Sequence, residues 1–177
     1  MKTHTFAVFA IVAGLSAAGG VAYYLHSPGG GAGMDAGEVV GRVLAAPLAD
    51  IKGGSQRIGQ WRGRVLVINY WATWCAPCRE EIPMFVRMQE RYGDRGLQFV
   101  GIAIDQPGKV AEFAAEFRVN YPLLIAGMDS LELLRQAGNR AGVLPYTLVI
   151  DRKGNLVSRE PGGLKEARLE RLLQPLL

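Results

Sequence analysis

The chain has 177 residues, of which 49% are hydrophobic and 20% charged, and its formal net charge is +4. This length suits one domain with a segment to spare, and the apolar content is too high for a disordered chain. The arginines are scattered from Arg42 to Arg171, so a solvent-exposed surface explains them better than nucleic-acid binding does. We expect one folded domain and no nucleic-acid partner.

Residues 1–26 have the composition of an export segment. Thr5–Leu25 contain no charged side chain, follow Lys2, and are long enough to cross a bilayer as a helix. We therefore expect an uncleaved, single-pass anchor in the bacterial inner membrane, with the rest of the chain in the periplasm. The alternative is a cleaved signal, for which Ser16–Ala18 offers small residues at a processing site.

Residues 27–37 are rich in glycine and lack apolar periodicity, which predicts a flexible tether. Their glycines do not have the spacing of a phosphate-binding loop. The folded domain is then expected over residues 38–177.

The first elements of this domain are a hairpin, a strand and a helix. The hairpin is predicted over Ala49–Ile58, with its turn at Gly53-Gly54. Val65–Tyr70 is a continuous β-branched and apolar run, typical of a strand buried on both faces. A helix over Cys75–Arg91 follows directly, with a kink expected at Pro83.

The remaining chain alternates strands with helices, which predicts an α/β domain with a mostly parallel sheet. Strands are expected over Leu97–Ile104, Pro122–Ile125, Tyr146–Ile150 and Asn155–Arg159, and helices over Lys109–Phe117, Ser130–Ala137 and Leu164–Leu173. The last two strands form an antiparallel hairpin at the sheet edge.

Cys75 and Cys78 are the only cysteines, and they stand where a buried strand meets a helix. Zinc needs about four ligands, yet the only histidines, His4 and His26, lie in the export segment, so we expect no metal site. Haem attachment needs His in the place of Arg79. A purely structural bridge would add little stability across so short a loop. A reversible redox pair fits better, because a helix N-terminus favours the thiolate.

The segment Val67–Pro83, which contains WATWCAPC, closely resembles the active-site segment of membrane-anchored thioredoxin-like proteins of the TlpA, ResA and CcmG type. The resemblance covers residues 44–177 and includes Val143–Thr147 and an extra helix-strand unit near Pro107–Met128. It implies a thioredoxin fold with an N-terminal β-hairpin and an inserted helix-strand unit before the cis-proline segment.

The resemblance also implies the roles of the two cysteines. Cys75 is expected to be the attacking, partly exposed thiol, and Cys78 the resolving thiol buried behind it. Similar proteins are reduced again by a transmembrane electron donor, and this chain has no flavin or nicotinamide motif. We therefore expect no cofactor.

A client-binding surface is expected around the cysteines. By the resemblance, the Leu144-Pro145 bond is cis, and its backbone lies beside Cys75, where a carbonyl and an N–H are free to pair with an extended client. Trp74 is expected to contact partners, together with Ala76 and Pro77.

Glu81 lies one turn beyond Cys78, where similar proteins carry an acid, and a carboxylate there would raise the pKa of Cys78 and relay its proton. The alternative is a surface acid. Asn69 replaces the buried acid of many cytosolic thioredoxins and is equally explained as a buried residue satisfied by backbone groups. Met84 and Met88 are interpreted as core residues rather than a copper site.

The function predicted is therefore that of a protein-disulfide reductase of exported proteins, serving cytochrome c maturation or copper-site assembly. Its clients would be apocytochrome c or copper-site proteins. The alternatives are an oxidase or isomerase of exported proteins, a copper-binding delivery module using both cysteines, and a redox-inert scaffold.

Overall fold

The computed structural model describes residues 35–177, except for the side chains of residues 128–129. The predicted anchor over residues 1–26 and most of the predicted tether lie outside the described residues. Among those that are described, no helix has both the length and the apolar character needed to cross a membrane.

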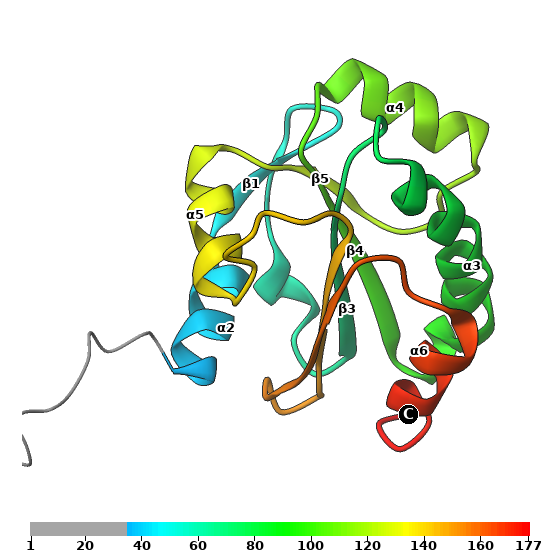
Figure 1. Cartoon of the computed structure of the whole chain (residues 1–177). Helices are drawn as coiled ribbons and strands as arrows, with labels where there is room; N and C mark the ends of the chain where they lie inside the picture. The colour runs from blue at the N-terminus through cyan, green and yellow to red at the C-terminus, as the bar shows by residue number, and fades with distance from the viewer. Residues whose placement is uncertain (1–34) are drawn as a thin grey trace, which may run out of the picture. The chain divides into compact units, whose positions relative to one another are not determined.

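The centre of the domain is a seven-stranded sheet of order β2-β1-β5-β4-β3-β6-β7 (Figure 1). Its strands are β1 (Pro47–Asp50), β2 (Ser55–Arg57), β3 (Val65–Trp71), β4 (Leu97–Ala103), β5 (Leu123–Ile125), β6 (Tyr146–Ile150) and β7 (Leu156–Pro161). Only the pairs β3–β4 and β4–β5 are parallel, and the other four pairs are antiparallel. The expectation of a mostly parallel sheet is therefore wrong, because both hairpins join the sheet and β6 runs antiparallel to β3.

Helices cover both faces of this sheet. They are α2 (Ala36–Ala45), α3 (Ala76–Tyr92), α4 (Pro107–Glu116), α5 (Met128–Gln136) and α6 (Glu166–Leu173), with short 3-10 helices η1 (Ile58–Trp61) and η2 (Gly93–Arg95). Figure 1 shows α3 and α6 on one face, and α2 and α5 on the other. The expected hairpins, the inserted α4–β5 unit and the thioredoxin-like α/β fold are confirmed.

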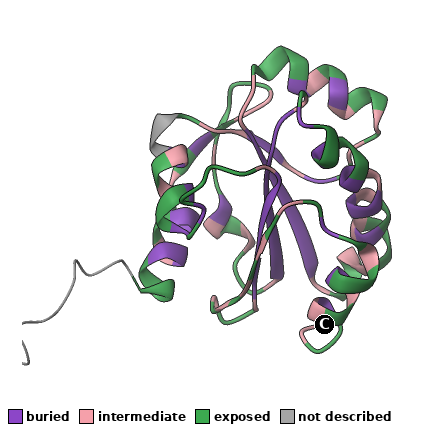
Figure 2. Ribbon diagram, in the orientation of Figure 1, coloured by how far each residue is buried: buried purple, intermediate pink, exposed green. Residues whose placement is uncertain are grey.

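The sheet separates two hydrophobic cores, and Figure 2 shows its inner strands buried. Strand β3 supplies alternate residues to them: Val65, Val67 and Trp71 to the core under α3, and Leu66, Ile68 and Tyr70 to the core under α2. Asn69 falls in the row under α3 and is only 2% exposed. A single polar side chain therefore enters an otherwise apolar row, directly beneath the predicted active-site helix.

Helix α2 is the one long element that sequence reasoning did not expect, and it begins within the predicted tether. The carboxylate of Asp35 caps it by accepting a hydrogen bond from the Glu38 N–H at 2.8 Å. Its buried face consists of Val39, Val40, Val43 and Leu44.

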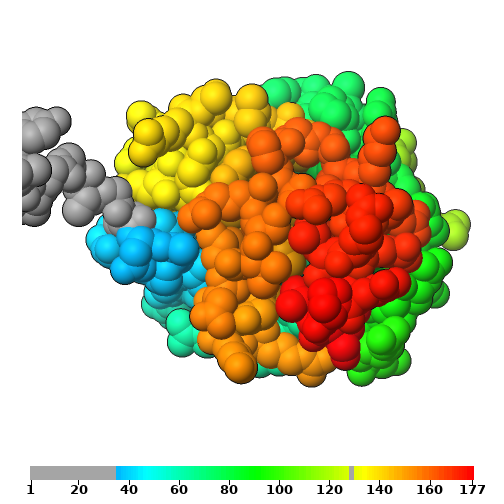
Figure 3. Space-filling model, turned by 60° about the horizontal axis from the view of Figure 1, so that its bottom comes forward, coloured from blue at the N-terminus to red at the C-terminus, as the bar shows by residue number. Residues whose placement is uncertain are grey.

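The C-terminal segment closes the domain. Figure 3 shows α6, in red, beside β7, in orange, and α3, in green. Glu166 and Glu170 of α6 accept hydrogen bonds from Arg87 and Arg91 of α3, at 2.9 and 3.1 Å. These exposed ion pairs supplement the apolar contacts of Leu169 and Leu173.

Candidate active site

Cys75 and Cys78 form a disulfide, with their Cα atoms 5.3 Å apart. Cys75 is the N-cap residue of α3, and Cys78 lies in its first turn. Cys78 is fully buried, as the resemblance implied. Cys75 is 6% exposed, which is less than the partly exposed thiol expected, so only the edge of this residue reaches the surface.

The local sequence explains why a helix begins at this bridge. Cys75 has an extended backbone conformation, and Pro77 occupies one of the first helical positions, where a missing N–H is tolerated. No side chain caps the helix. The free N–H groups and the dipole at this end therefore favour negative charge on the Cys75 sulfur once the bridge opens.

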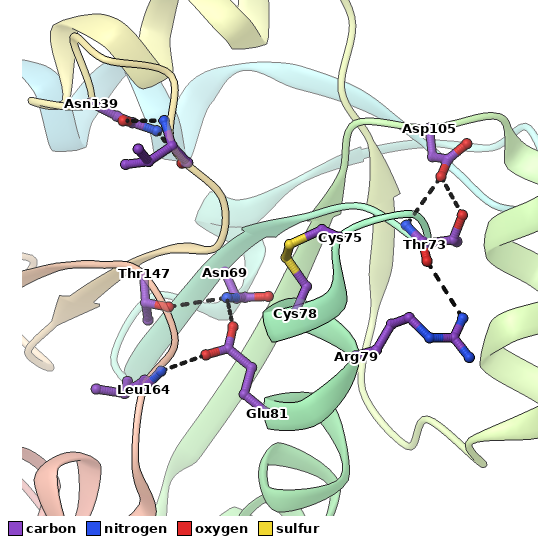
Figure 4. The surroundings of a disulfide bond; sticks show 11 residues. Asn69, Thr73, Cys75, Cys78, Arg79, Glu81, Asp105, Asn139, Thr147 and Leu164 are labelled. Carbon is purple, nitrogen blue, oxygen red and sulfur yellow. Dashed lines mark hydrogen bonds between the residues drawn. A yellow bond between two sulfur atoms is a disulfide. The ribbon is translucent and has the colours of Figure 1, made fainter.

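A buried polar cluster lies beside the disulfide, on the side of Thr147 (Figure 4). Glu81, which is 4% exposed, accepts hydrogen bonds from the Asn69 side-chain amide at 2.9 Å and from the Leu164 N–H at 2.8 Å. The same Asn69 amide group donates to the Thr147 hydroxyl at 3.0 Å. Glu81 is therefore not the surface acid of the alternative interpretation, and the partners of Asn69 are side chains rather than the backbone groups suggested.

The environment of Glu81 changes its acidity. Desolvation by burial raises the pKa of Glu81 to about 7, although the hydrogen bonds from Leu164 and Asn69 oppose that rise. Burial raises the pKa of the Tyr121 phenol, and the charge of Glu81 raises it further. A carboxylic acid with such a pKa exchanges protons near neutral pH.

A second, more exposed polar cluster lies in front of the disulfide. Asp105 accepts hydrogen bonds from both the hydroxyl and the N–H of Thr73, two residues before Cys75. The Arg79 guanidinium donates to the Thr73 carbonyl at 3.4 Å and lies over the rings of Phe113 and Phe117. This cluster connects the active-site loop to the inserted helix α4.

Sequence reasoning missed the pairing of Asp105 with Thr73, although the sequence contains a signal for it. Thr73 follows β3, Asp105 follows β4, and these two strands are parallel neighbours with Trp71 paired to Ala103. The carboxyl ends of parallel strands meet at one edge of a sheet, and polar residues that follow them come together there.

The predicted client-binding residues fall into an exposed and a less accessible group. Trp74 is 68% exposed, and both Ala76 and Pro77 are exposed. Leu144 is half-buried and Pro145 is buried, and the bond between them is cis, as expected.

A glycine-containing loop connects the cis-proline segment to the start of α3. The Gly162 N–H donates to the Pro145 carbonyl at 2.8 Å, so that carbonyl is already occupied. Gly163 lies against Pro77, since a Cβ atom placed on it would be 3.6 Å from the proline side chain. The Pro145 carbonyl therefore already accepts one hydrogen bond from this loop, and Pro145 has no N–H to donate.

Other expectations concern metals and packing. Within the described part of the chain, no group of three or more His, Cys, Asp or Glu side chains could hold a metal ion. Met84 and Met88 are buried in the core under α3, as expected, while His4 and His26 lie outside the described residues.

Known proteins are similar to this chain in sequence and in structure. The Redoxin family profile matches residues 36–173. The thiol-disulfide oxidoreductase ResA of Geobacillus kaustophilus is 30% identical over 130 residues, which cover 73% of this chain and 72% of that protein. ResA of Halalkalibacterium halodurans is 26% identical over 128 residues, which cover 72% and 70%.

A solved structure has a similar fold. A thioredoxin family thiol:disulfide interchange protein from Chlorobium tepidum superimposes with a TM-score of 0.66 at 28% identity, covering 76% of this chain and 97% of that one. With the Cys75–Cys78 bridge at a helix start, these likenesses show that the chain belongs to the Redoxin family and is a thiol-disulfide oxidoreductase of the ResA type.

Proposed function

We propose that the protein is a dithiol reductase of exported cysteine-containing proteins. Its clients are apocytochrome c or proteins with a copper site, which both require reduced cysteines before the haem or metal is inserted. The observation that carries the proposal is a disulfide at the N-terminus of α3 with a buried acid, Glu81, one turn behind it.

The proposed cycle begins with both cysteines reduced. The Cys75 thiolate attacks a client disulfide, forms a mixed disulfide, and releases one client sulfur as a thiolate that takes up a proton. Cys78 then loses its proton and attacks Cys75. This second step forms the Cys75–Cys78 bridge and releases the other client sulfur, so the client gains two electrons and the protein loses two.

Glu81 is the proposed acceptor of the Cys78 proton. It lies three residues after Cys78 on the same helix, and its pKa of about 7 leaves it partly ionised at neutral pH. A glutamate with the ordinary pKa of 4.5 would be a far weaker base for a thiol.

The client is proposed to bind across the start of α3. The exposed ring of Trp74 offers apolar contact area, and Ala76 and Pro77 leave the approach to the bridge free of bulky groups. The backbone of Leu144, before the cis proline, pairs with the client as a short extended segment.

The site of action proposed is the periplasmic side of the bacterial inner membrane. The proposed anchor is residues 1–26, and the proposed tether runs from residue 27 to the start of α2. Each client disulfide consumes two electrons, which is the one pair that the two cysteines store. The bridge must then be reduced again, and a transmembrane electron donor is proposed to supply those electrons.

Trapping the mixed disulfide tests the cycle. A Cys78→Ser variant keeps the attacking thiol and loses the resolving one. We therefore expect a disulfide-linked complex with client proteins, which dithiothreitol separates. Cys75→Ser is the matched control, which should form no such complex. Equal trapping by both variants would contradict the assigned order of attack.

A redox titration against glutathione tests the direction of electron flow. A reductase requires a midpoint potential close to that of thioredoxin, about −270 mV, whereas an oxidant such as DsbA lies near about −120 mV. A value at the oxidising end would overturn the reductase assignment and favour the oxidase or isomerase.

A further inference from the structure

Asn69 is buried beside the active site, and the proposed cycle gives it no role. It lies on β3 directly opposite Thr147 of β6, and its side chain reaches Glu81 of α3. The Asn69 amide therefore links β3, β6 and α3, and the residue is only 2% exposed.

The hydrogen bonds fix which way the amide points. An ionised Glu81 has only acceptor oxygens, so Asn69 must present its Nδ2 group to it, at 2.9 Å. The same Nδ2 group also donates to Thr147 at 3.0 Å. Both donors of the amide are thereby used on one side, and Oδ1 faces the other.

Asn69 Oδ1 is buried and has no hydrogen-bond partner among the described residues. Figure 4 shows this oxygen on the side of the amide that faces Cys78, away from Glu81 and Thr147. A buried acceptor without a donor is destabilising, and such atoms are rare in folded proteins. While the disulfide is closed, neither sulfur carries a hydrogen that could satisfy it.

Opening the bridge changes this situation. Reduction adds two electrons and two protons, breaks the S–S bond and places a hydrogen on the Cys78 sulfur. We propose that Asn69 is a positioning residue whose Oδ1 accepts a hydrogen bond from the Cys78 thiol in the reduced protein, while its Nδ2 keeps Glu81 beside that thiol.

This arrangement makes the reduced form more favourable. The oxygen is unsatisfied in the disulfide form and satisfied in the dithiol form, whereas the two Nδ2 hydrogen bonds are present in both. Removing the amide therefore selectively destabilises the dithiol form. The inference rests on the proposed redox cycle of Cys75 and Cys78.

An Asn69→Leu variant tests the inference through the redox equilibrium with glutathione. We expect the equilibrium constant for reduction to fall about tenfold, which corresponds to a midpoint about 30 mV more negative for a two-electron couple. An unchanged constant would overturn the inference.

Asn139→Leu is the matched control. Asn139 is also 2% exposed, and both polar atoms of its side chain are bonded to the backbone of Val143, at 2.8 and 3.0 Å. This variant also loses a buried amide, so it should lose stability, but its redox equilibrium should stay at the wild-type value. A shift equal to that of Asn69→Leu would assign the effect to general loosening and overturn the inference.

A spectroscopic measurement does not require the leucine variant to fold. In Cys75→Ser, Cys78 carries the only thiol of the chain, so a single S–H stretching band is expected in the infrared spectrum. We expect this band at a lower frequency than that of an alkanethiol in an apolar solvent, and we expect the lower value to persist in Cys75→Ser/Glu81→Gln. A band at the free-thiol frequency, or one that shifts back only when Glu81 is replaced, would overturn the assignment to Asn69.

Failure of the inference and failure of the proposed function give different results. A bridge that no thiol reductant opens would overturn the function, and the inference with it. A bridge that opens with the same constant in the wild type and in Asn69→Leu would overturn the inference alone.

Discussion

Two carboxylates lie on opposite sides of the disulfide, and their surroundings give them opposite acidities. Glu81 is buried behind the bridge with two donors, and desolvation raises its pKa to about 7. Asp105 is only partly buried, on the other side of the bridge. Desolvation raises its pKa as well, but three hydrogen bonds from Thr73 and Gln106 outweigh this effect and lower the pKa below its ordinary value.

The difference shows that the balance between burial and donors decides whether an acid here can exchange protons at neutral pH. Glu81 loses more by its removal from water than its two donors return. Three hydrogen bonds and the charge of Lys109 exceed the cost of burial at Asp105. Glu81 is thereby suited to proton exchange, and Asp105 to a permanent charge that holds a loop.

The largest effect expected concerns stability as a function of pH. The pKa of Glu81 is about 7 when folded and 4.5 for the unperturbed group, so the folded protein binds more protons between these values. The free energy of unfolding should therefore fall by about 3 kcal/mol as the pH rises from 4.5 through 7. Urea unfolding of the oxidised protein at several pH values measures this slope.

The matched variants for this measurement are Glu81→Gln and Asp105→Asn. The first should remove most of the slope between pH 4.5 and 7, and the second should leave it in place. Tyr121, which faces Glu81, does not titrate in this window, because its pKa is raised further above 10. An equal slope in Glu81→Gln would show that another group carries the pH dependence.

A smaller effect is expected when the outer cluster loses its carboxylate. Asp105→Ala removes the acceptor of two Thr73 donors and should lower the free energy of unfolding at pH 7 by about 1 to 2 kcal/mol. Asp105→Asn, which retains an acceptor oxygen, should lose less. In the wild type the same contribution should disappear as the pH falls below 3.8, the ordinary value for this group. Equal stability of all three proteins would contradict the role given to this cluster.

The smallest effect expected comes from Arg79. Its guanidinium lies 5.2 Å from the ring centre of Phe113 and 5.3 Å from that of Phe117, and the side chain is exposed. Arg79→Ala should lower the free energy of unfolding by about 0.5 to 1 kcal/mol. Arg79→Lys keeps the charge and should recover part of the loss, whereas a loss no smaller in the lysine variant would contradict a cation–π contribution.

Much of the fold could be predicted from the sequence, because most of its elements have local signals. The apolar run of β3, the CxxC motif at the start of α3 and the hairpin turns depend only on neighbouring residues. Helix α2 also had such a signal, with Asp35 before a helical apolar pattern. The nearby glycines obscured it and favoured a tether.

What sequence reasoning could not supply depends on contacts between distant residues. The direction of β6 beside β3 is not encoded in either strand alone, so the proportion of parallel pairs was overestimated. Likewise, Asn69 and Thr147 are 78 residues apart, and Leu164 is 83 residues from Glu81. The cysteines and Glu81 could be identified from their spacing and the resemblance, but the distant partners that hold Glu81 in place could not.

The two outermost strands of the sheet, β2 and β7, are poorly suited to pairing with strands of other molecules. β2 is only three residues long, and β7 ends in Arg159, Glu160 and Pro161, where charges and a missing N–H oppose the addition of another strand. Other copies of the protein therefore cannot readily extend the sheet by adding a strand at either edge. The sheet edges thereby protect the folded domain against pairing with strands of other chains.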